Sequence, residues 1–61
     1  MFTVINSLFD IEGTQYDIIY YHDFNIYAVV RDDIQLFRGS LQDSNNFAYY
    51  LIMGLNQLYK P

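Results

Sequence analysis

The chain has to fold without a covalent cross-link, because its 61 residues include no cysteine. A chain this short buries only about 60% of the surface that its unfolded form exposes, so its margin of stability is thin. Small domains compensate with disulfides, a metal, oligomerisation or dense apolar packing. The lack of cysteine closes the first route and excludes redox and thiolate-metal chemistry. We therefore expect a single domain over residues 1–61 that depends on dense packing, self-association or both.

The aromatic content favours dense packing. The sequence contains seven tyrosines and five phenylalanines, and 52% of its residues are hydrophobic. Aromatic rings bury large areas, but each tyrosine hydroxyl needs a hydrogen-bond partner or water. Seven tyrosines are hard to hide in so small a body. We expect several exposed rings, which is typical of a protein-binding face.

Runs of β-branched and aromatic residues predict an antiparallel β meander. The strands are expected at about 16–22, 26–31 and 34–38, and Asp32-Asp33 is a two-residue hairpin connection between the last two. Five apolar residues of this hairpin are expected to share one buried face: Ile26, Ala28, Val30, Ile34 and Leu36.

The first segment, about residues 2–9, fits two structures. Helical spacing is present in four apolar residues: Met1, Val4, Ile5 and Leu8. Against this, Thr3, Val4 and Ile5 are consecutive β-branched residues, which suit a strand better than a helix. We predict a strand, with a helix as the alternative.

A C-terminal helix is predicted at about 44–59, where Asp43 or Ser44 can cap the first free N–H groups. One face is expected to pack on the sheet: Phe47, Tyr50, Leu51, Gly54, Leu55 and Leu58. A second apolar stripe contains Tyr49, Ile52 and Tyr59, with Met53 between the two. A helix that is apolar nearly all round is buried on more than one side. The predicted fold is therefore α+β, a meander of three or four strands against one helix whose second face meets another copy or another protein.

Catalytic and metal sites are not predicted. His22 is the only histidine, and a catalytic histidine needs an orienting group and a pocket. Asp10 with Glu12, and Asp32 with Asp33, lack the ligand number of a calcium loop. The three glycines are isolated, so no phosphate loop is present. We expect no enzyme activity, no cofactor and no metal.

The charge is asymmetric along the chain. The net charge is −4, and residues 1–30 contain Asp10, Glu12, Asp17 and Asp23 but no lysine or arginine. Such a field repels nucleic-acid phosphates and attracts basic surfaces. The longest apolar run, 47–55, is far shorter than the roughly 20 residues of a membrane span. We expect a cytoplasmic protein that binds neither membranes nor nucleic acid directly.

The leading hypothesis is a small acidic protein-binding module that inhibits a nucleic-acid-acting protein by charge mimicry. In size, architecture and charge the chain resembles small phage-encoded or mobile-element inhibitors, although no single motif carries the resemblance and no residue role is transferred. The predicted partner-binding residues are Asp10, Glu12, Asp17, Asp23, Tyr21 and Tyr27.

Two alternatives stay open. The first is an obligate homodimer that associates through Tyr49, Ile52, Met53 and Tyr59. The second is weak binding of single-stranded nucleic acid through exposed aromatic rings, which normally requires a positively charged groove as well.

Overall fold

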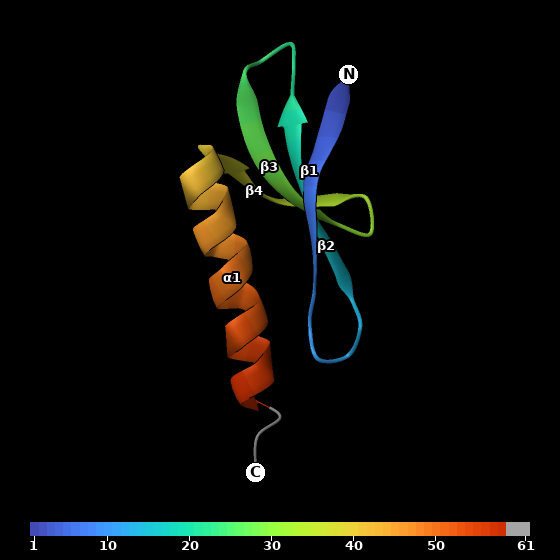
Figure 1. The fold of residues 1–61 in the computed structure, drawn as a ribbon, viewed down its shortest axis with the longest axis vertical. Helices are drawn as coiled ribbons and strands as arrows, with labels where there is room; N and C mark the ends of the chain where they lie inside the picture. The colour runs from blue at the N-terminus through green and yellow to red at the C-terminus, as the bar shows by residue number, and fades with distance from the viewer. Residues whose placement is uncertain (59–61) are drawn as a thin grey trace.

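A computed structural model describes the backbone of residues 1–58 and the side chains of residues 1–54. It contains four strands followed by one helix (Figure 1): β1 Phe2–Phe9, β2 Gln15–Tyr21, β3 Ile26–Arg31, β4 Ile34–Gly39 and α1 Leu41–Leu58. The strands form one sheet in the order β1-β2-β3-β4, and each strand is antiparallel to the next. The predicted α+β meander with a single C-terminal helix is confirmed.

The first segment is a strand, as its β-branched residues predict. β1 pairs with β2 from Phe2 opposite Tyr21 to Phe9 opposite Gln15. The register shifts between Val4 and Asn6, so that Ile5 is an extra residue without a partner on β2. Such a β-bulge changes which face the following side chains occupy. As a result Phe2 and Phe9, seven positions apart, both lie on the same face of the sheet.

The β3–β4 connection is the predicted two-residue hairpin. Asp32 and Asp33 have φ values of 51° and 65°, the left-handed conformations of a type I′ turn. The predicted buried face of this hairpin is wrong, because the two-residue turn pairs Arg31 with Ile34 and so places Ile34 on the opposite face from Ala28 and Val30. Val29 pairs with Phe37 and is fully buried, whereas Ile34 is 60% exposed. A bulge between Val29 and Val30 leaves Leu36 without a partner on β3 and shifts the pairing beyond it by one residue.

The helix begins earlier than predicted. Ser40, and not Asp43 or Ser44, is the cap: its Oγ accepts a hydrogen bond from the Asp43 N–H (3.1 Å), and its carbonyl accepts one from the Ser44 N–H (2.9 Å). Ser44 instead lies within the helix and is fully buried. The Gly39-Ser40 break after β4 therefore belongs to the start of the helix, since a serine hydroxyl is a preferred N-cap acceptor.

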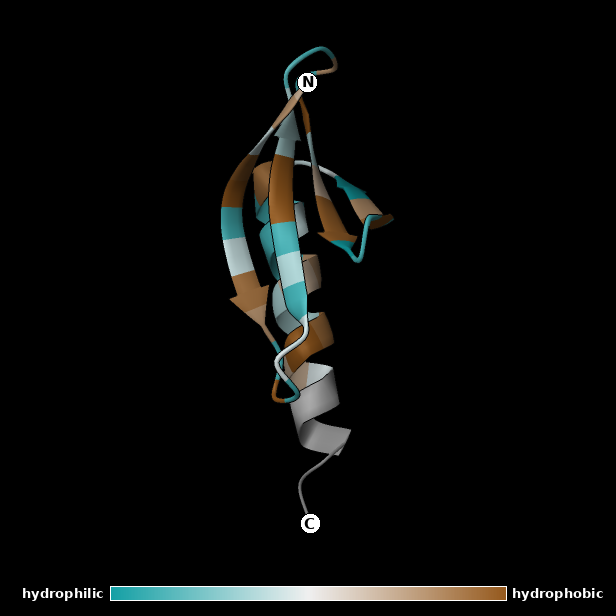
Figure 2. Cartoon of the chain, turned by 90° about the vertical axis from the view of Figure 1, so that its right-hand side faces the viewer, coloured by the Kyte–Doolittle hydropathy of each residue, from teal (hydrophilic) through white to brown (hydrophobic). Residues whose placement is uncertain are grey.

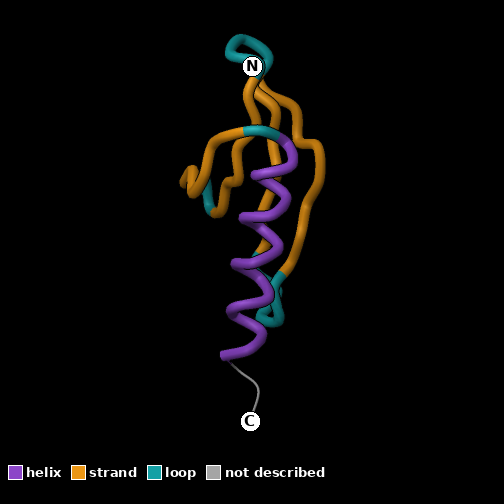
Figure 3. The backbone as a smooth tube through the Cα atoms, turned by 90° about the vertical axis from the view of Figure 1, so that its left-hand side faces the viewer, coloured by secondary structure: helices purple, strands orange, loops and turns teal. Residues whose placement is uncertain are grey.

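The core lies between α1 and one face of the sheet. Ile18, Val29 and Ala48 form its centre, with Leu8, Phe37 and Phe47 packed around them. The Phe37 and Phe47 rings are stacked, with centroids 4.9 Å apart. Figure 3 shows α1 running along this face, where it contacts β3 most, then β4 and β2. The opposite face, seen in Figure 2, has no helix over it within residues 1–58.

The side of the helix that packs on the sheet overlaps only in part with the predicted one: Phe47 and Leu51 face the sheet as predicted, but Tyr50 does not. Tyr50 was expected to face the core but is 71% exposed. The buried positions follow Ser44, Phe47, Ala48 and Leu51, which have the i, i+3, i+4, i+7 spacing of one face. Small side chains at Ser44 and Ala48 let the helix approach the sheet closely, so hydrophobicity alone misplaces the stripe. Gly54 has open space around it. Among the described residues, no helix combines the length and apolar character needed to cross a membrane.

Candidate functional site

A hollow lies on the sheet face opposite the helix. Its volume is about 190 Å³, and it is lined by Phe2, Asp17, Ile19, Tyr21, Val30, Asp33 and Gln35. Phe2 comes from β1 and Gln35 from β4, the two opposite edges of the sheet. The sheet must therefore curl for both edges to border one hollow. In Figure 1 the β3–β4 turn projects to the side away from α1, which makes this face concave.

A second hollow of about 230 Å³ adjoins the first. It is lined by Gln15, Asp17, Val30, Asp32 and Asp33, and it shares Asp17, Val30 and Asp33 with the first. We call the two hollows together the acidic groove. Its lining contains three carboxylates and no lysine, arginine or histidine.

The floor and one wall of the acidic groove are apolar. Ile19 is only 4% exposed, although no helix covers this face. Ile19 lies between Val4 of β1 and Ala28 of β3 in the sheet, so the curl of the sheet itself shields it. At the rim the rings of Phe2 and Tyr21 meet edge to face, with centroids 6.2 Å apart. The groove thus combines an apolar floor with acidic edges.

Asp17 is held in place but keeps binding capacity. Its Oδ1 accepts hydrogen bonds from Ser7 Oγ on β1 and from Gln15 Nε2 on β2, both at 2.8 Å. The Oδ2 atom takes no hydrogen bond from the described residues. A carboxylate has about four acceptor sites, so Asp17 can accept a further donor. The two neutral donors fix its position without neutralising its charge.

The two arginines do not neutralise the groove. Arg31 lies over the Tyr16 ring, 5.8 Å from its centroid, on the helix-covered side. Arg38 pairs with Ala28 in the β3–β4 ladder and so shares the open face, but it is not among the residues that line the groove. Within residues 1–54, no lysine or arginine forms an ion pair with Asp17, Asp32 or Asp33. Among the described residues, the lining of the acidic groove therefore carries three carboxylates and no ion pair to them.

Asp10 was predicted to bind a partner, but the structure gives it a local role. It is only 9% exposed, in the turn between β1 and β2. Its Oδ1 accepts hydrogen bonds from the N–H groups of Glu12 and Thr14 (both 2.9 Å), and its Oδ2 accepts one from the Tyr16 hydroxyl (3.0 Å). Burial opposes ionisation, but these hydrogen bonds outweigh it and hold the pKa of Asp10 below its ordinary value. The carboxylate closes the turn. Glu12 lies exposed in the same turn.

Tyr16 completes this turn from the covered side. It is 1% exposed, and burial is the main cause that raises the pKa of its hydroxyl. The Asp10 carboxylate raises the pKa further, while Arg31 lowers it. Tyr16 therefore anchors Asp10 as a neutral hydrogen-bond donor.

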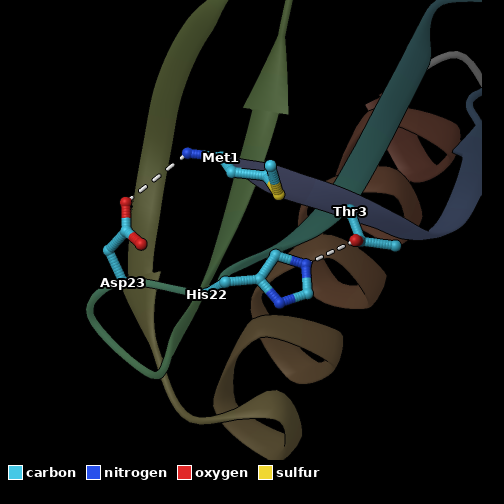
Figure 4. Close-up of polar contacts among 4 residues, drawn as sticks. All are labelled: Met1, Thr3, His22 and Asp23. Atoms are coloured by element: carbon cyan, nitrogen blue, oxygen red, sulfur yellow. Dashed lines mark hydrogen bonds and ion pairs between the residues drawn. The ribbon is translucent and has the colours of Figure 1, made fainter.

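Asp23, the next predicted residue, lies at the other end of the sheet (Figure 4). Its Oδ2 is 3.6 Å from the Met1 amino group, and both side chains are well exposed. Beside it, His22 Nε2 and Thr3 Oγ1 are 2.6 Å apart. Exposed ion pairs of this kind contribute at most about 1 kcal/mol. These contacts join the start of β1 to the β2–β3 turn, away from the acidic groove.

The predicted aromatic residues are separated by the sheet. Tyr21 lines the acidic groove, but Tyr27 pairs with Tyr20 on the helix side, where their ring centroids are 4.8 Å apart. Of the six predicted partner-binding residues, the structure brings only Asp17 and Tyr21 together in the groove.

The predicted self-association residues also separate. Tyr49 is 57% exposed and Met53 36% exposed on the outer side of α1, whereas Ile52 is half-buried. Tyr59 lies outside the described residues. The outer face of the helix also includes Tyr50, whose ring meets that of Tyr49 edge to face at 5.7 Å.

Sequence reasoning missed Asp32 and Asp33 as site residues because it treated them as solvated turn residues. One signal was available: in a meander with this register, Asp17 lies opposite Val30, two residues before Asp32. Antiparallel pairing places residues that are distant in sequence directly across from each other. The acidic patch of the molecule thus combines one residue from the first half of the chain with two from the second.

The size of the acidic groove limits its chemistry. Pockets for drug-sized ligands measure roughly 300–1,000 Å³ and enclose most of the ligand. Each hollow here is smaller and open, so it suits one side chain of a macromolecular partner. A long cationic side chain matches it, with an apolar stem for the floor and a charged end for the carboxylates. Among the described residues, no three His, Cys, Asp or Glu side chains lie close enough to hold a metal ion.

Comparison with protein-family models, with curated proteins and with solved structures gives no significant match.

Proposed function

We propose that this protein is a non-enzymatic binding module that uses the acidic groove to occupy a basic surface of another protein. The observation that carries the proposal is the group of three carboxylates without cationic partners on a concave, partly apolar face. Interfaces gain specificity and association rate from such complementary charge. Two exposed rings add apolar contact area: Phe2 in the groove lining, and Phe24, whose ring meets that of Tyr21 edge to face at 6.5 Å.

The backbone of the β3–β4 turn supports a binding role. Asp32 and Asp33 both occupy left-handed conformations, which glycine and asparagine adopt more readily. Two aspartates in such a turn also repel each other. Unfavourable local choices of this kind concentrate at functional sites. A turn that places two carboxylates on the groove at some cost in stability is consistent with selection for charge there.

The partner class follows from the charge. Surfaces that bind nucleic acid are rich in lysine and arginine, which neutralise phosphates. An acidic groove flanked by aromatic rings offers such a surface an alternative occupant. We therefore propose that the partner is a nucleic-acid-acting protein in the cytoplasm and that binding inhibits it, as an inhibitor of phage or mobile-element origin would. Direct binding of single-stranded nucleic acid has less support, because Phe2 and Tyr21 share their face with Asp17 and Asp33.

The test is a capture experiment followed by competition. Tagged protein is incubated with nuclease-treated cell lysate at low and high salt, and the retained partner is then purified. We expect a partner that is lost at high salt and that releases its own nucleic acid when this protein is added. Binding that is indifferent to ionic strength, or that leaves the nucleic acid in place, contradicts charge mimicry.

A matched pair of variants locates the binding site. Asp17→Asn with Asp33→Asn removes two charges from the groove, while Glu12→Gln with Asp23→Asn removes two charges elsewhere. Because close charge pairs at interfaces contribute more than about 1.4 kcal/mol, we expect the first variant to weaken binding by about tenfold or more. The second should bind nearly as the unchanged protein does. Equal losses in both variants would show that overall charge, and not the groove, attracts the partner.

A further inference from the structure

We infer that the free edge of β1 is a site of antiparallel pairing with the β1 strand of a second copy of this chain. An edge strand exposes a row of backbone N–H and C=O groups that can pair with another strand. β1 is an edge of the sheet and is eight residues long. Dimerisation through this edge does not rest on the proposed function, although Phe2 belongs both to the edge and to the groove lining, and it differs from association through the outer face of the helix.

Apart from its bulge, β1 lacks the protection that edge strands usually have. Natural edges are kept apart by charged residues, proline, bulges or short length. Residues 2–9 contain no charged residue and no proline, and four of their apolar side chains are about half exposed: Phe2, Val4, Ile5 and Phe9. A chain with a net charge of −4 repels its own copy over most of its surface. The uncharged β1 is where two copies can meet without opposing carboxylates.

The sequence of β1 is complementary to itself in the antiparallel direction. When the strand pairs with its copy about its centre, Phe2 lies opposite Phe9, Thr3 opposite Leu8 and Val4 opposite Ser7. Aromatic rings at both ends then form cross-strand pairs, which are among the more favourable side-chain pairs in sheets. The same pairing extends the sheet from four strands to eight.

The bulge at Ile5 makes this register possible. Residues that pair across two antiparallel strands must lie on the same face of the sheet. In a regular strand Phe2 and Phe9 would lie on opposite faces, because they are an odd number of residues apart. The bulge places both on the open face, where Phe2 is opposite Tyr21 and Phe9 opposite Gln15.

The backbone directions agree with the same register. At one end of β1 the Met1 carbonyl accepts a hydrogen bond from the His22 N–H (3.2 Å), and at the other the Asp10 N–H donates to the Thr14 carbonyl (3.1 Å). Both groups point towards β2. Since backbone groups alternate in direction along a strand, those of Phe2 and Phe9 point outwards and can pair with the copy.

One outward donor is already bonded within the chain. The Ser7 N–H donates to Oδ1 of Asn6 (3.0 Å), an exposed hydrogen bond between neighbouring residues. This bond agrees with the alternation along the strand, by which the Ser7 N–H points away from β2. Pairing with the copy exchanges it for a backbone carbonyl, which is a roughly even exchange of hydrogen bonds.

Disulfide trapping tests the register directly, because the chain has no other cysteine. Val4→Cys and Ser7→Cys are made as separate proteins, oxidised alone and as a mixture, and analysed by mass spectrometry. Paired antiparallel residues have Cα separations of about 4.5–5.5 Å, which a disulfide can span. We expect the mixture to form the mixed dimer several-fold more than either protein forms a homodimer. Equal cross-linking in all three samples, or none in any, overturns the proposal.

A charge variant tests the edge without cysteine chemistry. Val4→Lys places a charge on the exposed edge, and Tyr49→Lys makes a comparable change on the outer face of the helix. Sedimentation equilibrium over a concentration series measures the dimer, and far-UV circular dichroism confirms that both variants are folded. We expect Val4→Lys to raise the dimer dissociation constant by about tenfold or more and Tyr49→Lys to leave it unchanged. The reverse result, or a monomeric parent protein at every concentration, overturns the proposal.

Discussion

The two faces of the sheet bury similar residues by different means. On the covered face, Ile18 and Val29 are fully buried because α1 packs over them. On the open face, Ile19 and Ala28 are almost as buried, yet no helix lies there. Their shielding comes from the curl of the sheet and from neighbouring strands. The covered face is therefore shielded from water by the helix, whereas the open face is shielded only by the curvature of the sheet.

This difference separates the face that sets the stability of the fold from the face that we propose binds a partner. The covered face is a packed core, where a change of one methyl group affects the fold. The open face has an apolar floor but is lined by Asp17, Asp32 and Asp33, which a packed core would exclude without partners. A concave surface formed by curvature can thus keep carboxylates in water and still offer an apolar contact. The following changes test this division, from the largest expected effect on stability to the smallest.

The largest effect is expected in the core. Ile18→Ala should lower the free energy of unfolding by about 3 kcal/mol, because it leaves a cavity beneath the helix. Val4→Ala, on the half-exposed open face, should cost less than about 1 kcal/mol. Urea denaturation of both variants measures the difference. Equal losses would mean that the open face is covered by another layer.

Low pH should destabilise the protein through the turn that joins β1 and β2. The pKa of Asp10 is lowered in the folded protein, so its stabilising effect is complete above its unfolded pKa of about 3.9 and is lost as the pH falls through the folded value. Asp10→Asn should be less stable than the parent at neutral pH and lose less stability in acid. Urea midpoints from neutral pH to about pH 2 measure this. Glu12→Gln, in the same turn, is the control, and an identical acid response in both variants contradicts the assignment.

Two serine substitutions four residues apart should change the stability of the protein in opposite directions. Ser44 Oγ is fully buried and has no hydrogen-bond partner within the described residues, so Ser44→Ala should raise stability by about 1 kcal/mol. Ser40→Ala removes the helix cap and should lower stability by about 1 kcal/mol. Thermal unfolding followed by circular dichroism separates them. A loss of stability in Ser44→Ala would show that its hydroxyl has a partner.

The smallest stability change is expected at the β3–β4 turn. Asp33→Gly relieves the strain of a left-handed conformation and removes the repulsion between Asp33 and Asp32. It should stabilise the protein by less than about 1 kcal/mol. The same change removes one carboxylate from the acidic groove and should weaken partner binding. Asp33→Asn, which also tolerates this conformation, should weaken binding equally with little effect on stability. Unchanged binding in both variants would exclude Asp33 from the interface.

Much of the fold was predictable from local sequence. The strands, the Asp32-Asp33 hairpin and the C-terminal helix follow from β-branched runs, turn residues and helical spacing. The start of the helix and its packed face were not predicted in full. Ser40 supplies the cap, and the small residues Ser44 and Ala48 face the sheet. Hydrophobicity ranks large side chains first, whereas close packing of a helix on a sheet selects small ones.

The candidate site was predictable only in part. Asp17 and Tyr21, two of the predicted partner-binding residues, both line the acidic groove, but Asp10 is held by Tyr16 and two backbone N–H groups. Asp32 and Asp33 joined the groove through strand pairing and curvature. Strand pairing and sheet curvature join residues that are far apart in sequence, so neither can be predicted from residue spacing.

The sequence by itself determined the class of this protein: a short acidic α+β chain without cysteine, rich in aromatic residues and built as a meander with one helix. These features depend on composition and on contacts between residues near in sequence. The tertiary structure decided which carboxylates gather, which aromatic rings share a face and that β1 is a free, uncharged edge. Two single-residue bulges and the curl of the sheet set these outcomes, since one extra residue moves every following side chain to the other face.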